Sequence, residues 1–169
     1  MKTLVVFYSY DGNSALVAEE LKRALGSAPG KALGEGCDTL EIKTQDEAKR
    51  SGFAKFLWGG RMVLTHKNPR LMPWHAELDG YDLIILGGPV WAGAPAPALQ
   101  AFIAEAKLQG KRIGLFLCHA GGPGKALDKL KALLAGNEIA GSIDFQNPGK
   151  QDRAAAAERV DGWVKALQG

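Results

Sequence analysis

The chain has 169 residues, of which 46% are hydrophobic and 23% are charged, and its formal net charge at pH 7 is +3. This balance is typical of a folded globular domain and excludes both a disordered chain and a fibrous protein. Because no apolar run approaches the ~20 residues of a membrane-spanning helix and no cleavage site follows the first residues, we expect a cytoplasmic protein with a single domain over residues 1–169. Cys37 and Cys118 have no paired spacing, which argues against a disulfide framework and against a zinc site.

Strand and helix patterns alternate in the first half of the chain. Residues Thr3 to Tyr8 form a short apolar run rich in β-branched and aromatic side chains, which predicts a strand buried on both faces. Asn13 or Ser14 can cap the helix that follows, because their side chains accept hydrogen bonds from free N–H groups at a helix start. Residues 37–42 predict a second strand, and the long connection after it contains a predicted helix at residues 53–64.

The same alternation continues in the second half. Residues Tyr81 to Leu86 predict another buried strand, which Gly87, Gly88 and Pro89 are expected to break. The later apolar patterns predict, in chain order, a helix around residues 99–103, a strand at 111–118, a helix at 127–134, a strand at 139–145 and a C-terminal helix around 160–167. Leu133 belongs to the apolar stripe of the helix at 127–134 and is expected to be buried.

Five strands that alternate with helices indicate an α/β fold with a doubly wound, five-stranded parallel sheet. Parallel neighbours need a crossover connection, and right-handed crossovers place helices on both faces of the sheet. We expect the strand order 2-1-3-4-5. In that order the winding reverses between strands one and three, so a ligand is expected at the carboxyl edge of the sheet, in the loops that begin at Ser9, Gly87 and Cys118.

The first of these loops reads Ser9-Tyr10-Asp11-Gly12-Asn13-Ser14 and leads into a helix. Hydroxyls, an amide and unpaired N–H groups at a helix start can hold an anion without a lysine. The loop has neither the G-x-G-x-x-G of dinucleotide folds nor the G-x-x-x-x-G-K-[ST] of phosphate-hydrolysing P-loops. Taken alone, the same residues are equally well explained as a helix N-cap.

The loop resembles the phosphate loop of the flavodoxin family, whose pattern is S/T-x-T-G-N-T. Ser9, Gly12, Asn13 and Ser14 match this pattern, and Asp11 stands where the family has a hydroxyl. The resemblance implies that the loop binds the phosphate of FMN. A carboxylate near a phosphate is repulsive, so we expect Asp11 to offer its backbone N–H and to turn its side chain away.

Two further loops extend the resemblance over nearly the whole chain. The segment after strand three fits the family motif G-x-P-x-W-x-G, which implies flavin contacts from Pro89, Val90, Trp91, Ala92 and Gly93. Trp91 is expected to pack on or beside the flavin ring; the alternative is an indole that fills the core under the loop. The loop after strand four resembles the third family loop, which implies contacts to the pyrimidine end of the flavin from Cys118, His119 and Gly121.

These loops contain no catalytic cluster. Cys118 and His119 are neighbours on a strand and therefore point to opposite faces, which argues against a nucleophile with its base. The flavin supplies the redox chemistry, so we expect either a carrier that passes electrons to redox proteins or an FMN-dependent NAD(P)H oxidoreductase with a quinone or similar acceptor. A domain that has lost its flavin and serves in regulation is the third possibility. No feature indicates a nucleic-acid partner.

The charge distribution bears on this choice. Residues 43–75 carry seven Lys or Arg and two Asp or Glu, a net charge of +5, which leaves −2 for the rest of the chain. Carriers of the flavodoxin family are typically strongly acidic, whereas this chain has a pI near 8.9. We expect the basic segment to shape access to the flavin, with core packing for its tryptophans and surface positions for its histidines as the alternatives. Its aromatic and basic residues include Trp58, Arg61, His66, Arg70, Trp74 and His75.

Overall fold

The computed structural model describes residues 1–26, 36–45, 69–150 and 153–168. The strands are β1 (Thr3–Tyr8), β2 (Cys37–Ile42), β3 (Leu83–Trp91), β4 (Ala94–Pro95), β5 (Arg112–His119) and β6 (Glu138–Gln146). The helices are α1 (Asn13–Gly26), α3 (Pro97–Ala106), α4 (Ala126–Leu133) and α5 (Arg153–Gln168), with two short 3-10 helices, η1 (Leu78–Gly80) and η2 (Pro148–Lys150). These bounds confirm the predicted alternation; the helix predicted at 53–64 lies outside the described residues.

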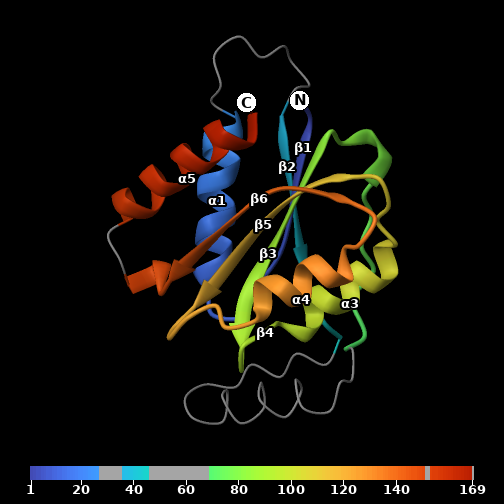
Figure 1. The fold of residues 1–169 in the computed structure, drawn as a ribbon, viewed down its shortest axis with the longest axis horizontal. Helices are drawn as coiled ribbons and strands as arrows, with labels where there is room; N and C mark the ends of the chain where they lie inside the picture. Colours follow the sequence, from blue (N-terminus) through green and yellow to red (C-terminus); the bar gives the residue numbers. More distant parts are fainter. Residues whose placement is uncertain (27–35, 46–68, 151–152, 169) are drawn as a thin grey trace.

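Five long strands form one parallel sheet in the order β2-β1-β3-β5-β6. This is the predicted order 2-1-3-4-5 with one addition, because the two-residue strand β4 pairs antiparallel with the end of β3. In Figure 1, α1 and α5 cover one face of the sheet, and α3 and α4 cover the other. The carboxyl ends of the neighbouring strands β1 and β3 therefore lie where the winding changes direction.

The side chains of β1 are buried on both faces of the sheet, as its sequence predicts. Val5 and Phe7 join the core beneath α1 and α5, whereas Leu4, Val6 and Tyr8 join the core beneath α3 and α4. Alternate residues of a strand point to opposite faces, so a sheet covered on both sides needs this continuous apolar run.

Two local expectations are wrong. Leu133 is 48% exposed, because α4 ends at this residue and its buried residues are Ala126 and Leu130. β3 is not broken at Gly87 but continues through Pro89 to Trp91. The pairing of β1 with β3 stops at Gly87, so the missing N–H of Pro89 removes no bond to β1.

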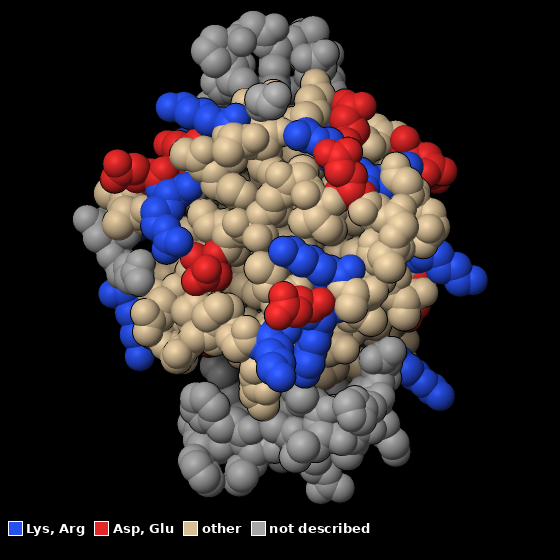
Figure 2. Space-filling model, in the orientation of Figure 1, with Lys and Arg blue, Asp and Glu red and all other residues tan. Residues whose placement is uncertain are grey.

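The described helices include none long and apolar enough to cross a membrane. On the face shown in Figure 2, the Lys and Arg side chains of the described residues are interspersed with Asp and Glu. A mixed surface of this kind does not steer partners of one charge sign.

Candidate functional site

The loop between β1 and α1 leaves one N–H group at the helix start without an acceptor in the part of the chain that the structure describes. The N–H of Ala15 donates to Oγ of Ser9 at 3.1 Å, and the N–H of Asn13 donates to Oδ1 of Asp11 at 3.4 Å. The N–H of Ser14, between them, has no acceptor among the described residues. The N–H of Ser14 is therefore a hydrogen-bond donor at the positive end of the α1 dipole.

The Asp11 side chain lies beside the start of α1; that it turns away from a bound phosphate stays a prediction. Its carboxylate is exposed to solvent, yet one oxygen reaches the N–H of Asn13. An aspartate two residues before a free N–H at a helix start can satisfy that group locally.

A buried hydroxyl lies at the floor of the same loop. Ser14 is 1% exposed, and its Oγ makes no hydrogen bond to another described residue. Burial raises the pKa of the Cys118 thiol to about 12; the nearby Ser14 hydroxyl opposes this rise, and the charge of Asp11 adds to it. Ser14 and Asp11 therefore both lie near the end of β5, and Cys118 remains a neutral thiol at pH 7.

The loop is tied to a distant part of the chain. Oδ1 of Asn13 accepts a hydrogen bond from the N–H of Gly149 in η2 at 2.8 Å. A Cβ at position 149 would approach this oxygen to 2.8 Å, so glycine allows the close contact. No local pattern could reveal this contact, because 136 residues separate the partners.

The second predicted loop is a tight hairpin between β3 and β4. Pro89 is buried, and Val90 and Trp91 are half-buried at the end of β3. Ala92 and Gly93 have φ angles of +48° and +71°. Two successive positive φ values are the geometry of a type I′ turn, which reverses a twisted strand in two residues.

Two tyrosines hold the ring of Trp91. Its centroid lies 6.0 Å from that of Tyr8 and 5.7 Å from that of Tyr10, with interplanar angles of 80° and 88°. Both contacts are edge-to-face, the arrangement that aromatic quadrupoles favour. Because Tyr8 is buried, the indole rests partly on the core, which confirms part of the core-packing alternative; a contact with a ligand stays a prediction.

The third predicted loop follows β5, and His119 at the end of this strand pairs with an aspartate on β6. Nε2 of His119 lies 2.8 Å from Oδ2 of Asp144 on β6. A carboxylate can only accept, so Nε2 carries the donated proton. The His119 side chain is 6% exposed, and its buried Nδ1 has no partner among the described residues. Sequence reasoning did not find this pair, which depends on the pairing of two strands.

The first two carbonyl groups of the third loop are occupied, whereas the N–H groups of the next two residues are not. The N–H of Asn147 donates to the carbonyl of His119 at 2.8 Å, and Nε2 of Gln146 donates to the carbonyl of Ala120 at 2.9 Å. The N–H groups of Gly121 and Gly122 meet no acceptor in the described parts of the chain. The carbonyl groups of Gly121 and Gly122 likewise meet no donor in those parts of the chain, so the loop offers both donors and acceptors to a ligand.

The second and third loops touch through two glycines. Gly124 has a φ of +54°, and a Cβ at this position would lie 3.0 Å from Cα of Gly93. The backbones can approach so closely because Gly124 has no side chain.

The described end of the basic segment packs against α3. The ring of Trp74 lies 4.8 Å from that of Phe102, which confirms the core-packing alternative for this tryptophan. Arg70 and His75 are exposed. Trp58, Arg61 and His66 lie outside the described residues.

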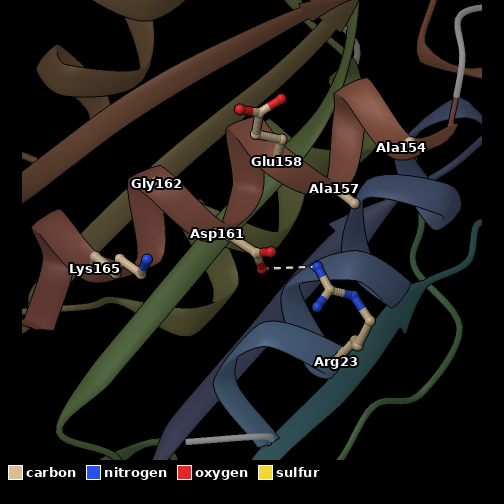
Figure 3. A pocket seen from close by; sticks show the side chains of 7 residues that line it. All are labelled: Arg23, Ala154, Ala157, Glu158, Asp161, Gly162 and Lys165. Atoms are coloured by element: carbon tan, nitrogen blue, oxygen red, sulfur yellow. Dashed lines mark hydrogen bonds and ion pairs between the residues drawn. The ribbon is translucent and has the colours of Figure 1, made fainter.

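A separate groove runs between α1 and α5 and contains none of the predicted site residues (Figure 3). Its lining consists of Arg23, Ala154, Ala157, Glu158, Asp161, Gly162 and Lys165. Arg23 reaches across it from α1 to Asp161 on α5, at 2.7 Å.

Solved structures share this architecture. A flavoprotein from Lactobacillus acidophilus NCFM, solved in complex with FMN, is 20% identical, with 96% of this chain and 98% of that chain covered and a TM-score of 0.71. A Bacteroides uniformis protein provisionally described as a flavoprotein is 22% identical, with 97% of each chain covered and a TM-score of 0.75. Two-electron reduced Megasphaera elsdenii flavodoxin is 19% identical, with 95% and 98% covered and a TM-score of 0.53.

The chain has the flavodoxin fold. No protein-family model matches its sequence, and no curated protein does. Within this flavodoxin fold the three loops described above lie at the carboxyl ends of β1, β3 and β5, the edge at which doubly wound sheets bind ligands.

Proposed function

We propose that the chain binds FMN non-covalently and transfers electrons through it. The observation that carries this proposal is the start of α1, where neither the N–H of Ser14 nor the buried Oγ of the same residue has a hydrogen-bond partner among the described residues. A buried hydroxyl without a partner costs free energy, and a phosphate oxygen at the helix start would satisfy both groups.

The donors around the loop fit a phosphate. Ser9 accepts a bond from Ala15 and keeps its own O–H to donate, and Asn13 uses its Oδ1 on Gly149 and keeps its amide N–H groups. Gly12 adopts a φ of +88°, which opens the turn. The proposed phosphate contacts are Ser9, Asp11 through its backbone, Gly12, Asn13 and Ser14.

The other two loops fit the ring of a flavin. The hairpin offers Pro89, Val90, Trp91, Ala92 and Gly93, and the third loop offers main-chain donors around Cys118, His119 and Gly121. Donors suit the carbonyl oxygens of the pyrimidine ring. When bound, FMN would supply the electron-accepting chemistry, and the protein would orient the ring and shield it from water.

The direct test is the affinity for FMN, measured by quenching of flavin fluorescence with the full chain. We expect Gly12→Ala with Ser14→Ala to weaken FMN binding at least about tenfold, because the Ser14 hydroxyl donor and the turn geometry at Gly12 are lost. Ser142→Ala, at an exposed position on β6, serves as the control. Unchanged affinity in the double variant would show that the phosphate is placed wrongly. A colourless protein that FMN does not stabilise would instead support the flavin-free regulatory domain.

An NAD(P)H oxidoreductase is the second candidate, and the charge of the chain favours it. Carriers rely on a strong field of one sign to find their partners. Here the net charge is +3, and the face in Figure 2 shows both signs interspersed among the described residues. The proposed setting for either activity is the cytoplasm.

Anaerobic mixing of the FMN-loaded protein with NADH or NADPH separates the two candidates. Rapid bleaching of the flavin absorbance is the result expected of an oxidoreductase that delivers electrons to a quinone or similar acceptor. No bleaching, together with reduction by a redox protein such as a flavodoxin reductase, is the result expected of a carrier.

A further inference from the structure

The turn after β6 connects the third loop with the loop at the start of α1. The N–H of Asn147 donates to the carbonyl of His119 at 2.8 Å, and the N–H of Lys150 donates to the carbonyl of Asn147 at 2.8 Å, which closes η2. Gly149 lies within this turn and donates its N–H to Oδ1 of Asn13 at 2.8 Å. The backbone of η2 is therefore held by hydrogen bonds of its own, independently of Asn13.

The contact with Gly149 decides which way the Asn13 amide faces. A backbone N–H can only donate, so the amide oxygen must face Gly149, and the amide nitrogen occupies the other arm of the group. Asn13 is the first residue of α1 and directly precedes Ser14, whose N–H has no acceptor among the described residues. The orientation leaves the amide hydrogens of Asn13 available to an anion at this helix start.

Glycine is the residue that fits at position 149 without moving this amide. A Cβ there would lie 2.8 Å from Oδ1 and 3.8 Å from Cγ of Asn13. The amide is the end of a side chain that can rotate, whereas the backbone of η2 is held in place, so the Asn13 side chain is the group that would move. Gly149 does not have a positive φ, so its substitution by alanine adds no backbone strain.

We propose that Gly149 is a positioning residue of the phosphate site, which acts by holding the Asn13 amide with its N–H groups directed to the phosphate of FMN. The inference rests on the proposed function, because it requires a phosphate at the start of α1. It assigns to a residue 136 positions away in the chain a part in the preference for FMN over riboflavin, which has the same ring and ribityl chain without the phosphate.

The test compares the dissociation constants of FMN and riboflavin for the full chain and for Gly149→Ala. We expect FMN to bind about tenfold more weakly to the variant, because a hydrogen bond to a charged phosphate is lost. Riboflavin should bind within about twofold of its original affinity. The urea midpoint of the flavin-free variant should match that of the original chain, because only the end of one side chain moves.

The matched control is Gly80→Ala. Gly80 also lies in a three-residue 3-10 helix, η1, and has no atom within 4 Å of the place where its Cβ would be. This substitution should leave the affinities for both flavins unchanged.

A double-mutant cycle tests whether Gly149 acts through Asn13. Asn13→Ala removes the amide and should weaken FMN binding by about the same factor as Gly149→Ala. Adding Gly149→Ala to Asn13→Ala should then weaken FMN binding no further. If the two effects multiply instead, Gly149 acts by another route and the inference is overturned. The cycle uses FMN alone, so it gives an answer even when riboflavin binds too weakly to be measured.

The outcomes separate this inference from the proposed function. If FMN binds and the FMN-to-riboflavin ratio is the same in the original chain and in Gly149→Ala, the role of Gly149 is overturned and the proposed function stands. A Gly149→Ala protein that does not fold also overturns this role, because the Cβ has then displaced more than the Asn13 amide. If neither flavin binds to the original chain, the proposed function fails and the inference fails with it.

Discussion

Gly87 allows the two strands β3 and β5 to pack with an aromatic ring beside the backbone. A Cβ at this position would overlap the ring of Phe116, which is fully buried beneath α1 and α5. Gly87→Ala must therefore displace a ring in a close-packed core, and we expect a loss of about 1–3 kcal/mol in the free energy of unfolding. Urea unfolding of the variant and of the original chain measures this loss.

The control for this prediction is Gly80→Ala. Gly80 has open space where its Cβ would be, so its substitution should change stability by less than about 1 kcal/mol. Equal effects at positions 80 and 87 would mean that the Phe116 ring moves aside at little cost.

The residues of the candidate site differ in how far sequence alone could predict them. The loop from Ser9 to Ser14 is a contiguous pattern, and its place after a buried strand is readable from the sequence. The pairing of His119 with Asp144 is not, because it depends on the register of β5 with β6, which shifts between Ile113 and Gly114. A one-residue change of register would send Asp144 to the opposite face.

The hairpin between β3 and β4 is an element that periodicity could not predict. Its second strand has two residues, too few for a pattern, and its turn uses an alanine at a φ of +48°. The longer elements were predictable because each buries a repeating apolar face, as in α5, whose buried residues include Val160 and Val164.

The positive φ of Ala92 in this turn leads to a prediction about the stability of the fold. Ala92→Gly should stabilise the fold by about 0.5–1 kcal/mol, because the relief of a left-handed alanine exceeds the added chain entropy of glycine. Gly93→Ala should have the opposite effect, since it adds a Cβ to a residue with φ +71°. Thermal and urea unfolding of the two variants provide the measurement. A destabilising Ala92→Gly would contradict the turn geometry.

An ion-pair network joins the first and last helices of the described chain. The Glu20 carboxylate, 5% exposed, lies 2.7 Å from Nε of Arg23 on its own helix and 2.8 Å from Nε of Arg153 at the start of α5. Arg23 also reaches Asp161 on α5 (Figure 3). Because α1 and α5 together cover one face of the sheet, this network stabilises the packing of that whole layer.

The network predicts how the stability of the molecule depends on pH. The hydrogen bond from Arg23 holds the pKa of Glu20 below its usual range, against the opposing effect of burial and with further help from Arg153. Because the pKa of Glu20 is lower in the folded than in the unfolded chain, its charged carboxylate stabilises the fold. This stabilisation is complete above the pKa of glutamate in the unfolded chain, about 4.3, and is lost as the pH falls through the lower pKa of the folded chain.

Glu20→Gln tests this prediction. At pH 7 the variant should be less stable by about 2 kcal/mol, because the two guanidinium groups then donate to a neutral amide oxygen instead of a charged carboxylate. The difference from the original chain should shrink as the pH falls below about 4, where the carboxylate of the original chain also becomes neutral. Urea unfolding at a series of pH values gives both results. The matched control is Glu19→Gln, whose side chain is 68% exposed and lies 3.4 Å from Arg153, so its effect should stay below about 1 kcal/mol. A Glu20→Gln deficit that stays constant down to low pH would assign the contribution of Glu20 to packing rather than to its charge.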